Sequence, residues 1–207
     1  MPNKPVEPRK LPVQERSRDT VDVILEAAAR IFVEKGYAAG TTNHIANKAG
    51  VSIGSLYQYF PNKDAILVSL AEQHLESAKT EIGEILLEAG EENVSIVKLI
   101  RDIVGAMIRM HMQAPRLHQV IFEEARLPGD LKHKLRAYED ALAETLCRLI
   151  DQNPNIDTQH PLLAARFMVR IVESLTHWYV IENPEGIAAP DVIDEITTIL
   201  SRYLQVQ

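Results

Sequence analysis

Apolar side chains recur along most of this chain at intervals of three and four residues, the spacing that places them on one face of an α-helix. Glycine is scarce, proline gathers at the breaks, and no stretch alternates apolar and polar residues as a half-buried strand would. The pattern therefore predicts an all-α fold with nine helices and no strands. We expect the helices at residues 19–35, 42–49, 53–59, 63–88, 95–113, 116–126, 130–151, 161–182 and 190–204.

The ends of the first helices carry specific stop and start residues. Gly36 follows the first apolar stripe, where a glycine ends many helices because it accepts a positive φ. Thr41 or Thr42, Ser52 and Asn62 each precede a predicted helix, and their side-chain oxygens can accept from its first amides.

Two of the predicted helices, 42–49 and 53–59, are short and are joined by Gly50-Val51-Ser52. Ala46 is small enough for the second helix to cross closely over the first, and Gly50 permits a positive φ where the chain reverses. Ile45, Val51 and Leu56 are expected to face inward. This spacing is typical of a helix–turn–helix, whose second helix enters the major groove of DNA.

The outward face of the second short helix favours DNA over simple packing. It carries small hydrogen-bonding groups and aromatic groups: Ser52, Gly54, Ser55, Tyr57, Gln58 and Tyr59. Gly54 lets the backbone come close, Ser55 can donate or accept, and Gln58 could pair with adenine. A helical hairpin used only for packing is the alternative, and it would carry Leu, Glu and Lys on this face.

The stretch 24–67 resembles the N-terminal domain of tetracycline-repressor-like (TetR/AcrR) bacterial regulators. The resemblance rests on three motifs, Ala27-Ala28-Ala29-Arg30-Ile31-Phe32 with Lys35-Gly36-Tyr37, then Thr41-Thr42…Ile45-Ala46…Ala49-Gly50-Val51-Ser52, and Gly54-Ser55-Leu56-Tyr57-Gln58-Tyr59-Phe60…Lys63-Asp64…Leu67. It implies an all-helical, dimeric transcriptional repressor that a small molecule releases from its operator.

The resemblance also assigns roles to individual positions. It implies phosphate contacts for Thr42, Tyr59 and Lys63, and groove contacts for Ser52, Gly54, Ser55 and Tyr57, with Asn43 and His44 as further candidates. His44 departs from the family pattern, where Arg or an acidic residue is more usual. Leu56 and Phe60 are expected in the core. Basic residues before the first helix either follow the DNA or form a solvated tail: Arg9, Lys10, Arg16 and Arg18.

The last two predicted helices look suited to pairing. Segment 161–182 is apolar on nearly all sides and therefore needs a cover on all sides, while segment 190–204 has one broad apolar face. Two copies of this helix pair would form a four-helix, two-fold homodimer interface. The alternative is a core contained within one chain.

Adaptable methionines, aromatic rings and a few polar groups predict a small-molecule pocket between segments 95–113 and 161–182. The candidate effector-binding residues are Met107, Met110, His111, Phe122, Tyr138, Glu173, His177 and Trp178. The alternative is that these side chains only fill the core, which is their commonest role at helical spacing.

Charge divides the chain. It carries 29 acidic and 22 basic side chains among 207 residues, a net charge of -7. Residues 1–64 hold nine Lys and Arg against seven Asp and Glu, a net charge of +2, so residues 65–207 carry -9. We expect a flexible basic arm at 1–18, a DNA-binding domain at 19–64 and a ligand-binding and dimerisation domain at 65–207. The acidic total is therefore no argument against DNA.

Other function classes find little support in the sequence. The single Cys147 excludes an internal disulfide, and neither a transmembrane run nor a secretory signal is visible, so a cytoplasmic protein is expected. His111 and His118 are seven residues apart with Pro115 between them, which predicts no metal site. No catalytic constellation and no cofactor motif stands out, so an enzyme with a helical catalytic domain is the least favoured interpretation.

The sequence thus predicts a ligand-responsive repressor that binds a near-palindromic double-stranded DNA operator as a homodimer. A small, lipophilic effector would release it. The alternative is a DNA-bound regulator controlled by a protein partner, and the sequence leaves an activator open.

Overall fold

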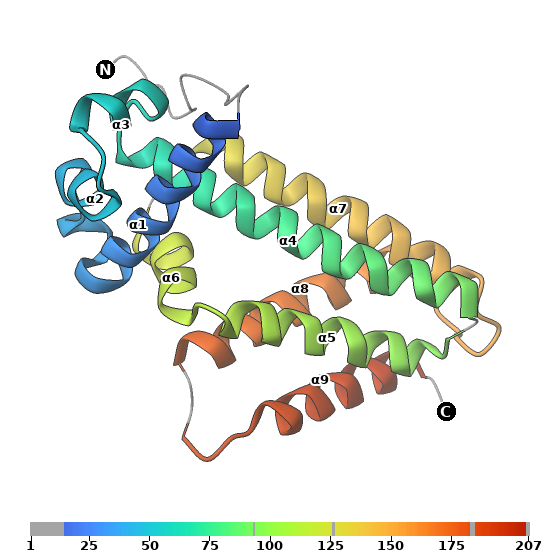
Figure 1. Cartoon of the computed structure of the whole chain (residues 1–207). Coiled ribbons are helices and arrows are strands. Elements are labelled where there is room, and N and C mark those ends of the chain that lie inside the picture. The colour runs from blue at the N-terminus through green and yellow to red at the C-terminus, as the bar shows by residue number, and fades with distance from the viewer. Residues whose placement is uncertain (1–14, 93, 126, 183–184, 206–207) are drawn as a thin grey trace. The chain divides into compact units, whose positions relative to one another are not determined.

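The computed structural model describes residues 15–92, 94–125, 127–182 and 185–205. Over these ranges it contains nine α-helices, one π-helical segment and no strand (Figure 1). The helices are α1 (Glu15–Ala39), α2 (Thr42–Ala49), α3 (Ile53–Tyr59), α4 (Lys63–Glu92), α5 (Ile96–Met112), α6 (Pro115–Gln119), α7 (Gly129–Asp151), α8 (Pro161–Glu182) and α9 (Ala189–Tyr203). The predicted all-α class is confirmed.

Helix α1 differs from its predicted bounds at both ends. It begins at Glu15, so Arg16 and Arg18 belong to a helix and not to the arm expected at 1–18. The rest of that arm, with Arg9 and Lys10, lies outside the described residues. Gly36 interrupts the helix where an end was predicted, with φ 72° and ψ 168°, but one further turn follows it. This backbone conformation is open almost only to glycine.

Side-chain caps fix the next helices where the sequence indicates. Thr41 accepts from the His44 amide at 3.2 Å, Ser52 from the Ser55 amide at 3.0 Å, and Asn62 from the Ala65 amide at 2.8 Å. Each satisfies an amide that the helix itself leaves without a partner. Gly50, with φ 67°, closes α2 as predicted.

The predicted helix 116–126 is instead two elements. Helix α6 ends at Gln119, and a π-helical segment η1 runs from Val120 to Glu124. The Ala125 amide donates to the Val120 carbonyl at 3.1 Å, the i to i−5 bond of a π-helix. Such widened turns depend on packing rather than on periodicity, which is why the apolar pattern did not reveal it.

The chain divides into two compact units. The first unit comprises Met1–Glu76 together with Arg116–Lys132, and the second comprises Ser77–Pro115 with His133–Gln207. The predicted domains 19–64 and 65–207 stay a prediction, and residue 64 lies in the first turn of α4. Segment 116–132 joins the first unit because η1 packs against α1.

Each unit has its own apolar core. In the first, buried side chains from α1, α2 and α3 meet, and Leu56 and Phe60 lie in the core as predicted; the main members are Ile24, Ala28, Phe32, Ile45, Leu56 and Phe60. In the second, α5 packs against α8 and α9, and its core includes Ile100, Val104, Ile108, Leu146, Ala165, Met168, Ile196 and Leu200. Among the described residues, no helix is long and apolar enough to cross a membrane.

Candidate DNA-binding surface and effector site

Helices α2 and α3 form the predicted helix–turn–helix. Ile45, Ala46 and Leu56 are buried, while Val51 in the turn is only half-buried. These apolar contacts fix the crossing of the two helices, so the opposite face of α3 is presented as a unit. This is the arrangement in which a second helix can enter a DNA groove.

The face of α3 away from the core presents most of the residues predicted to contact DNA. Ser52, Gly54, Tyr57 and Gln58 are exposed, and Ser55 and Tyr59 are half-buried. On α2, Asn43 and His44 are exposed, and Thr42 is half-buried. An added Cβ at Gly54 would meet only the Ser52 hydroxyl, at 3.7 Å, so the glycine keeps the surface low rather than relieving a clash.

Two hydroxyl pairs hold this surface in place. The Ser52 and Ser55 hydroxyl oxygens lie 2.8 Å apart, and the hydroxyls of Thr42 and Tyr57 lie 3.1 Å apart. The second pair links the first turn of α2 to the middle of α3. Two residues assigned separately to phosphate and groove contacts therefore form one hydrogen-bonded group.

Lys63 occupies a position that the sequence did not indicate. Its ammonium donates to three backbone carbonyls, those of Tyr37 at 2.7 Å, Ala38 at 3.1 Å and Gly40 at 3.2 Å. An ammonium has three N–H donors, so all of them are used on the last turn of α1. Its predicted phosphate contact stays a prediction, and this geometry gives the residue a structural role.

Tyr37 completes the link between α1 and α4. Its ring lies beneath the Lys63 ammonium, 4.4 Å from the centroid, and its hydroxyl donates to the Asp64 carboxylate. Burial, together with the neighbouring Asp64 carboxylate, raises the pKa of the Tyr37 hydroxyl above its ordinary value. The phenol therefore stays protonated and donates throughout the physiological range.

In the second unit, two of the predicted effector-binding residues meet directly. His111 of α5 is 2% exposed, and its ring lies 4.7 Å from that of His177 of α8 in an edge-to-face arrangement. Met110, which precedes His111 in the sequence, is buried, and Met107 is half-buried against the core. Helices α5 and α8 thus bring two of the candidate side chains, His111 and His177, into contact.

Glu173 takes part in a charged group that spans α7 and α8. The Arg170 guanidinium contacts the Glu139 carboxylate at 2.7 Å and the Glu173 carboxylate at 2.9 Å. Burial and the nearby Glu139 charge raise the pKa of Glu173 to about 7, against the opposing effect of Arg170. The sequence pointed to Glu173 but not to Glu139, which lies 34 positions earlier in the chain.

Tyr138 precedes Glu139 on α7, and the ammonium of Lys79 lies 5.9 Å from the centroid of its ring. Lys79 belongs to α4, so this contact joins α4 to α7 within the second unit. Lys79 was missed because its position in α4 carries no distinguishing sequence signal.

Two further candidate effector-binding residues have other contacts. Trp178 is 40% exposed, and its indole nitrogen donates to the Glu182 carboxylate at 2.8 Å. Phe122 belongs to the first unit, where its ring lies 4.6 Å from the His118 ring and 5.8 Å from that of His74. Their predicted role in effector binding stays a prediction.

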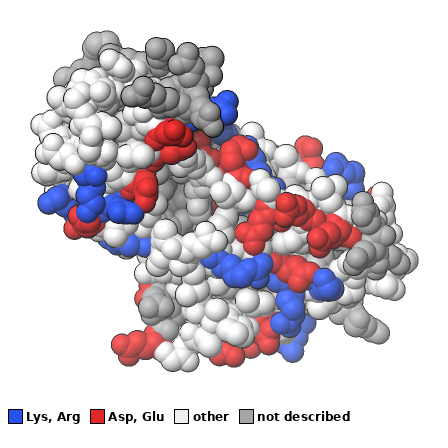
Figure 2. All heavy atoms as spheres, viewed as in Figure 1, with Lys and Arg blue, Asp and Glu red and all other residues white. Residues whose placement is uncertain are grey.

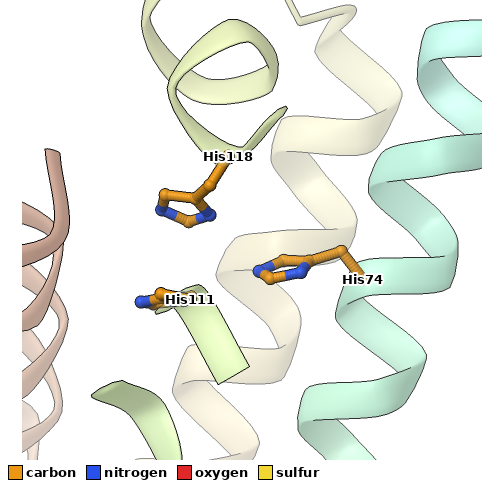
Figure 3. A group of neighbouring side chains, drawn as sticks. All are labelled: His74, His111 and His118. Carbon is orange, nitrogen blue, oxygen red and sulfur yellow. The ribbon is translucent and has the colours of Figure 1, made fainter. Parts of the chain in front are cut away.

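His74 and His118 form the centre of this aromatic cluster. Their rings lie 5.2 Å apart, and Figure 3 shows the His74 side chain extending from α4 and that of His118 from α6. His118 is 3% exposed, and burial lowers the pKa of His74 below its ordinary value, which favours the neutral imidazole. The pair offers two of the ligands that a four-coordinate metal would need. His111, also drawn there, belongs to the second unit.

Figure 2 shows Asp and Glu gathered beside Lys and Arg on part of the face that it draws, with uncharged surface between them. The second unit contains ion pairs of Arg101 with Asp194 and of Arg109 with Glu81. Exposed pairs of this kind contribute little to stability. Pairing within the segment leaves the net charge of -9 over residues 65–207 unchanged.

Comparison with known proteins identifies both the N-terminal and the C-terminal part of the chain as parts of a transcriptional regulator. The family model described as bacterial regulatory proteins, tetR family, matches residues 24–70, and the tetracyclin repressor-like C-terminal domain matches residues 95–204. The HTH-type transcriptional activator FasR of Mycolicibacterium smegmatis is 25% identical over 167 residues, 78% of this chain and 73% of FasR. The HTH-type transcriptional repressor KstR of the same organism is 26% identical over 151 residues, 70% of this chain and 71% of KstR.

A solved structure shares the fold. The transcriptional regulator FadR from Bacillus subtilis, in complex with stearoyl-CoA, matches with a TM-score of 0.68 at 21% identity, over 86% of this chain and 96% of FadR. One of the two family models spans more than half of the present chain, and the other covers its helix–turn–helix. The chain therefore belongs to the tetR family of bacterial transcriptional regulators.

Proposed function

We propose that this regulator is a repressor that binds a near-palindromic DNA operator as a homodimer and is released by a small lipophilic effector held in the second unit. The observation that carries the DNA part is the outward face of α3. It places Ser52, Gly54, Tyr57 and Gln58 in solvent on a helix fixed by buried Ile45 and Leu56. These groups can form hydrogen bonds with base edges or phosphates.

Exposed apolar side chains on α8 and α9 support the homodimer. Their exposed fractions lie between 40% and 47%, in Leu162, Leu163, Phe167, Trp178, Ile199 and Tyr203. The rings of Phe167 and Tyr203, one on each helix, lie 6.3 Å apart and so form part of one surface. A second copy of this surface would cover it in a two-fold interface.

The dimer can be tested with charged substitutions. We expect Phe167→Asp combined with Tyr203→Asp to leave a folded monomer. Dimerisation of this variant would bury the new carboxylates of each copy against the apolar surface of the other, which is unfavourable. The control is Leu87→Asp on α4, where the native side chain is 70% exposed and distant in sequence from this surface. Sedimentation that shows a monomer for the wild type, or a dimer for the double variant, would contradict the interface.

The second unit supports a ligand with an apolar body and a polar end. Its core has apolar walls from α5 and α8, and polar groups accompany them: His111 is buried, His177 and Glu173 are half-buried, and Arg170 is exposed. FadR, which shares the fold, binds stearoyl-CoA. Long-chain acyl compounds are therefore the first ligand class to test, with Arg170 and Lys79 as candidate partners for an acidic end.

Release requires that the ligand bind one state of the protein better than the other. A coupling of about 1–3 kcal/mol would already change DNA affinity roughly 5–150-fold. Helix α4 begins in the first unit and ends in the second, so it is the candidate element for this coupling.

The induction experiment measures affinity for a selected duplex against the concentration of stearoyl-CoA, palmitoyl-CoA and the free acids. We expect at least one to lower affinity at least tenfold. If a compound binds the second unit without changing affinity for DNA, the inducible mechanism is wrong. Control by a protein partner would then be the better account.

A further inference from the structure

The turn Gly36–Gly40, between the kink of α1 and the start of α2, is held from three sides within the first unit. The Gly40 amide donates to the Gly36 carbonyl at 3.1 Å, and Lys63 caps the carbonyls of the same turn from α4. Gly40 packs so closely on Phe32 that an added Cβ would lie 2.8 Å from its ring. The third contact comes from Glu124 in η1, outside the predicted DNA-binding domain.

Glu124 binds the kink itself. Its carboxylate accepts from the Tyr37 amide at 3.2 Å, and an added Cβ on Gly36 would lie 3.2 Å from the same oxygen, Oε2. Because Gly36 leaves helical geometry, the following amide points away from α1 and needs an acceptor elsewhere. The other carboxylate oxygen, Oε1, pairs with the Arg116 guanidinium, which also donates to the Gln119 side chain at 2.7 Å.

The π-helical turn accounts for the direction of this contact. Glu124 is the last residue of η1, whose Val120 and Ile121 are buried against the first unit. A widened turn shifts each later side chain around the helix axis relative to an α-helix. Neighbouring Glu123, which is exposed like Glu124, instead accepts from Gln119 at 3.2 Å.

The Gly36–Gly40 turn also positions the DNA-binding surface. Gly40 is followed at once by Thr41, the N-cap of α2, and Thr42 bonds to Tyr57 on α3. A displacement of the turn would therefore move the first residue of α2 and, through the hydroxyl pair, the exposed face of α3.

We infer that Glu124 is a positioning residue for DNA recognition, which fixes the Gly36–Gly40 turn through the Tyr37 amide and is itself oriented by Arg116. This inference rests on the proposed DNA-binding function. It extends the DNA-recognition machinery beyond the helix–turn–helix to segment 116–132, which the sequence places in the ligand-binding domain.

The first readout is amide hydrogen exchange in peptides covering residues 36–41 of the full chain. We expect Glu124→Ala to speed exchange there about tenfold, the scale of one lost charge-assisted hydrogen bond. The matched control is Glu123→Ala, one residue earlier in the same π-helical turn, which we expect to leave this region unchanged. Equal exchange in the two variants would overturn the contact.

The second readout is affinity for a duplex recovered by the wild type from a random library. We expect Glu124→Ala to weaken binding at least tenfold and Glu123→Ala less than twofold, at a temperature where all variants are folded. Should Glu124→Ala fail to fold, Glu124→Gln and Arg116→Ala can replace it in this experiment. Each weakens the ion pair between Arg116 and Glu124 while retaining a side-chain acceptor for the Tyr37 amide. Either is expected to weaken binding.

The two readouts separate the possible failures. Faster exchange with unchanged DNA affinity in Glu124→Ala would show a purely structural contact and overturn the positioning role. If the wild type recovers no duplex at all, the proposed function fails and the positioning role fails with it, whereas the exchange data still report whether Glu124 holds the Tyr37 amide.

Discussion

The two units hold their polar groups in different ways. In the first, the side chains expected to meet DNA lie at the surface and are fixed by short-range bonds, such as the Ser52 cap and the Thr42–Tyr57 hydroxyl pair. In the second, the half-buried carboxyl groups of Glu139 on α7 and Glu173 on α8 are bridged by the exposed Arg170 of α8. The first surface thus rests on contacts between near neighbours in the chain, whereas the charged group of the second unit joins two separate helices.

The comparison predicts that the first unit is sensitive to backbone strain and the second is not. Gly36→Ala would force a side chain into φ 72° and place its Cβ 3.2 Å from the Glu124 carboxylate. We expect a loss of about 2–3 kcal/mol and a fall in Tm of roughly 5–10 °C.

The matched control is Gly83→Ala, in the middle of α4 within the second unit, where no atom lies within 4 Å of an added Cβ. Here we expect a gain of about 1 kcal/mol from helix propensity. Thermal unfolding followed by circular dichroism measures both. A Gly36→Ala variant as stable as the wild type would contradict a turn fixed by its contacts.

Lys63 sharpens the comparison, because it lies in the first unit but acts on the backbone. We expect Lys63→Ala to lower stability by about 1–3 kcal/mol, since three carbonyls lose their donor. Removing a residue that also contacts phosphate would reduce the steepness of log affinity for DNA against log salt concentration, here called the salt slope, by about one. With its donors used, we expect the slope to stay unchanged.

The control for Lys63 is Lys48→Ala on α2, whose ammonium lies 3.0 Å from the Glu34 carboxylate in an exposed pair. It removes the same charge from the same unit without uncapping a helix, so stability should change by less than about 0.5 kcal/mol. A lower slope in Lys63→Ala would restore the phosphate contact that the family resemblance implies.

The smallest expected effect concerns the second unit and pH. The pKa of Glu173 is raised to about 7, so the folded protein holds this proton more tightly than the unfolded chain. Its contribution to stability is therefore full below the unfolded pKa of about 4.3 and is lost as pH rises through 7. Glu173→Gln cannot ionise, and we expect its gain in Tm to be about 2–4 °C larger at pH 8 than at pH 5.

Asp140→Asn is the control for that experiment. Asp140 follows Glu139 on α7 and pairs with Arg166 at 3.5 Å, with its side chain 62% exposed. Its effect on Tm should be small and alike at both pH values. A pH-independent gain in Glu173→Gln would show that the carboxyl does not titrate as the burial beside Glu139 implies.

The sequence predicted most of what depends on neighbours along the chain. The helix–turn–helix, the caps at Thr41, Ser52 and Asn62, and the special conformation at Gly36 all follow from residue types at fixed spacing. The helical bounds were accurate where a proline or glycine marks the break, as for α8.

The features that sequence missed depend on residues far apart in the chain. Lys63 meets carbonyls more than 20 positions earlier, and Glu124 meets an amide 87 positions earlier. No periodicity encodes such pairs, and the π-helical turn that aims Glu124 has no apolar signature. The place of Phe122 depends on such contacts too, since segment 116–132 follows the second unit in sequence but belongs to the first unit in space.

The central claim is that the exposed face of α3 recognises duplex DNA in a two-fold complex. The most direct measurement is selection from a random duplex library with the wild type, followed by titration of the recovered sequence with wild type and Tyr57→Ala. We predict two inverted half-sites centred about 34–36 Å apart, or a multiple of that distance, and at least tenfold weaker binding by a folded Tyr57→Ala. A library without enriched sequences, or equal binding by the two proteins, would contradict the account.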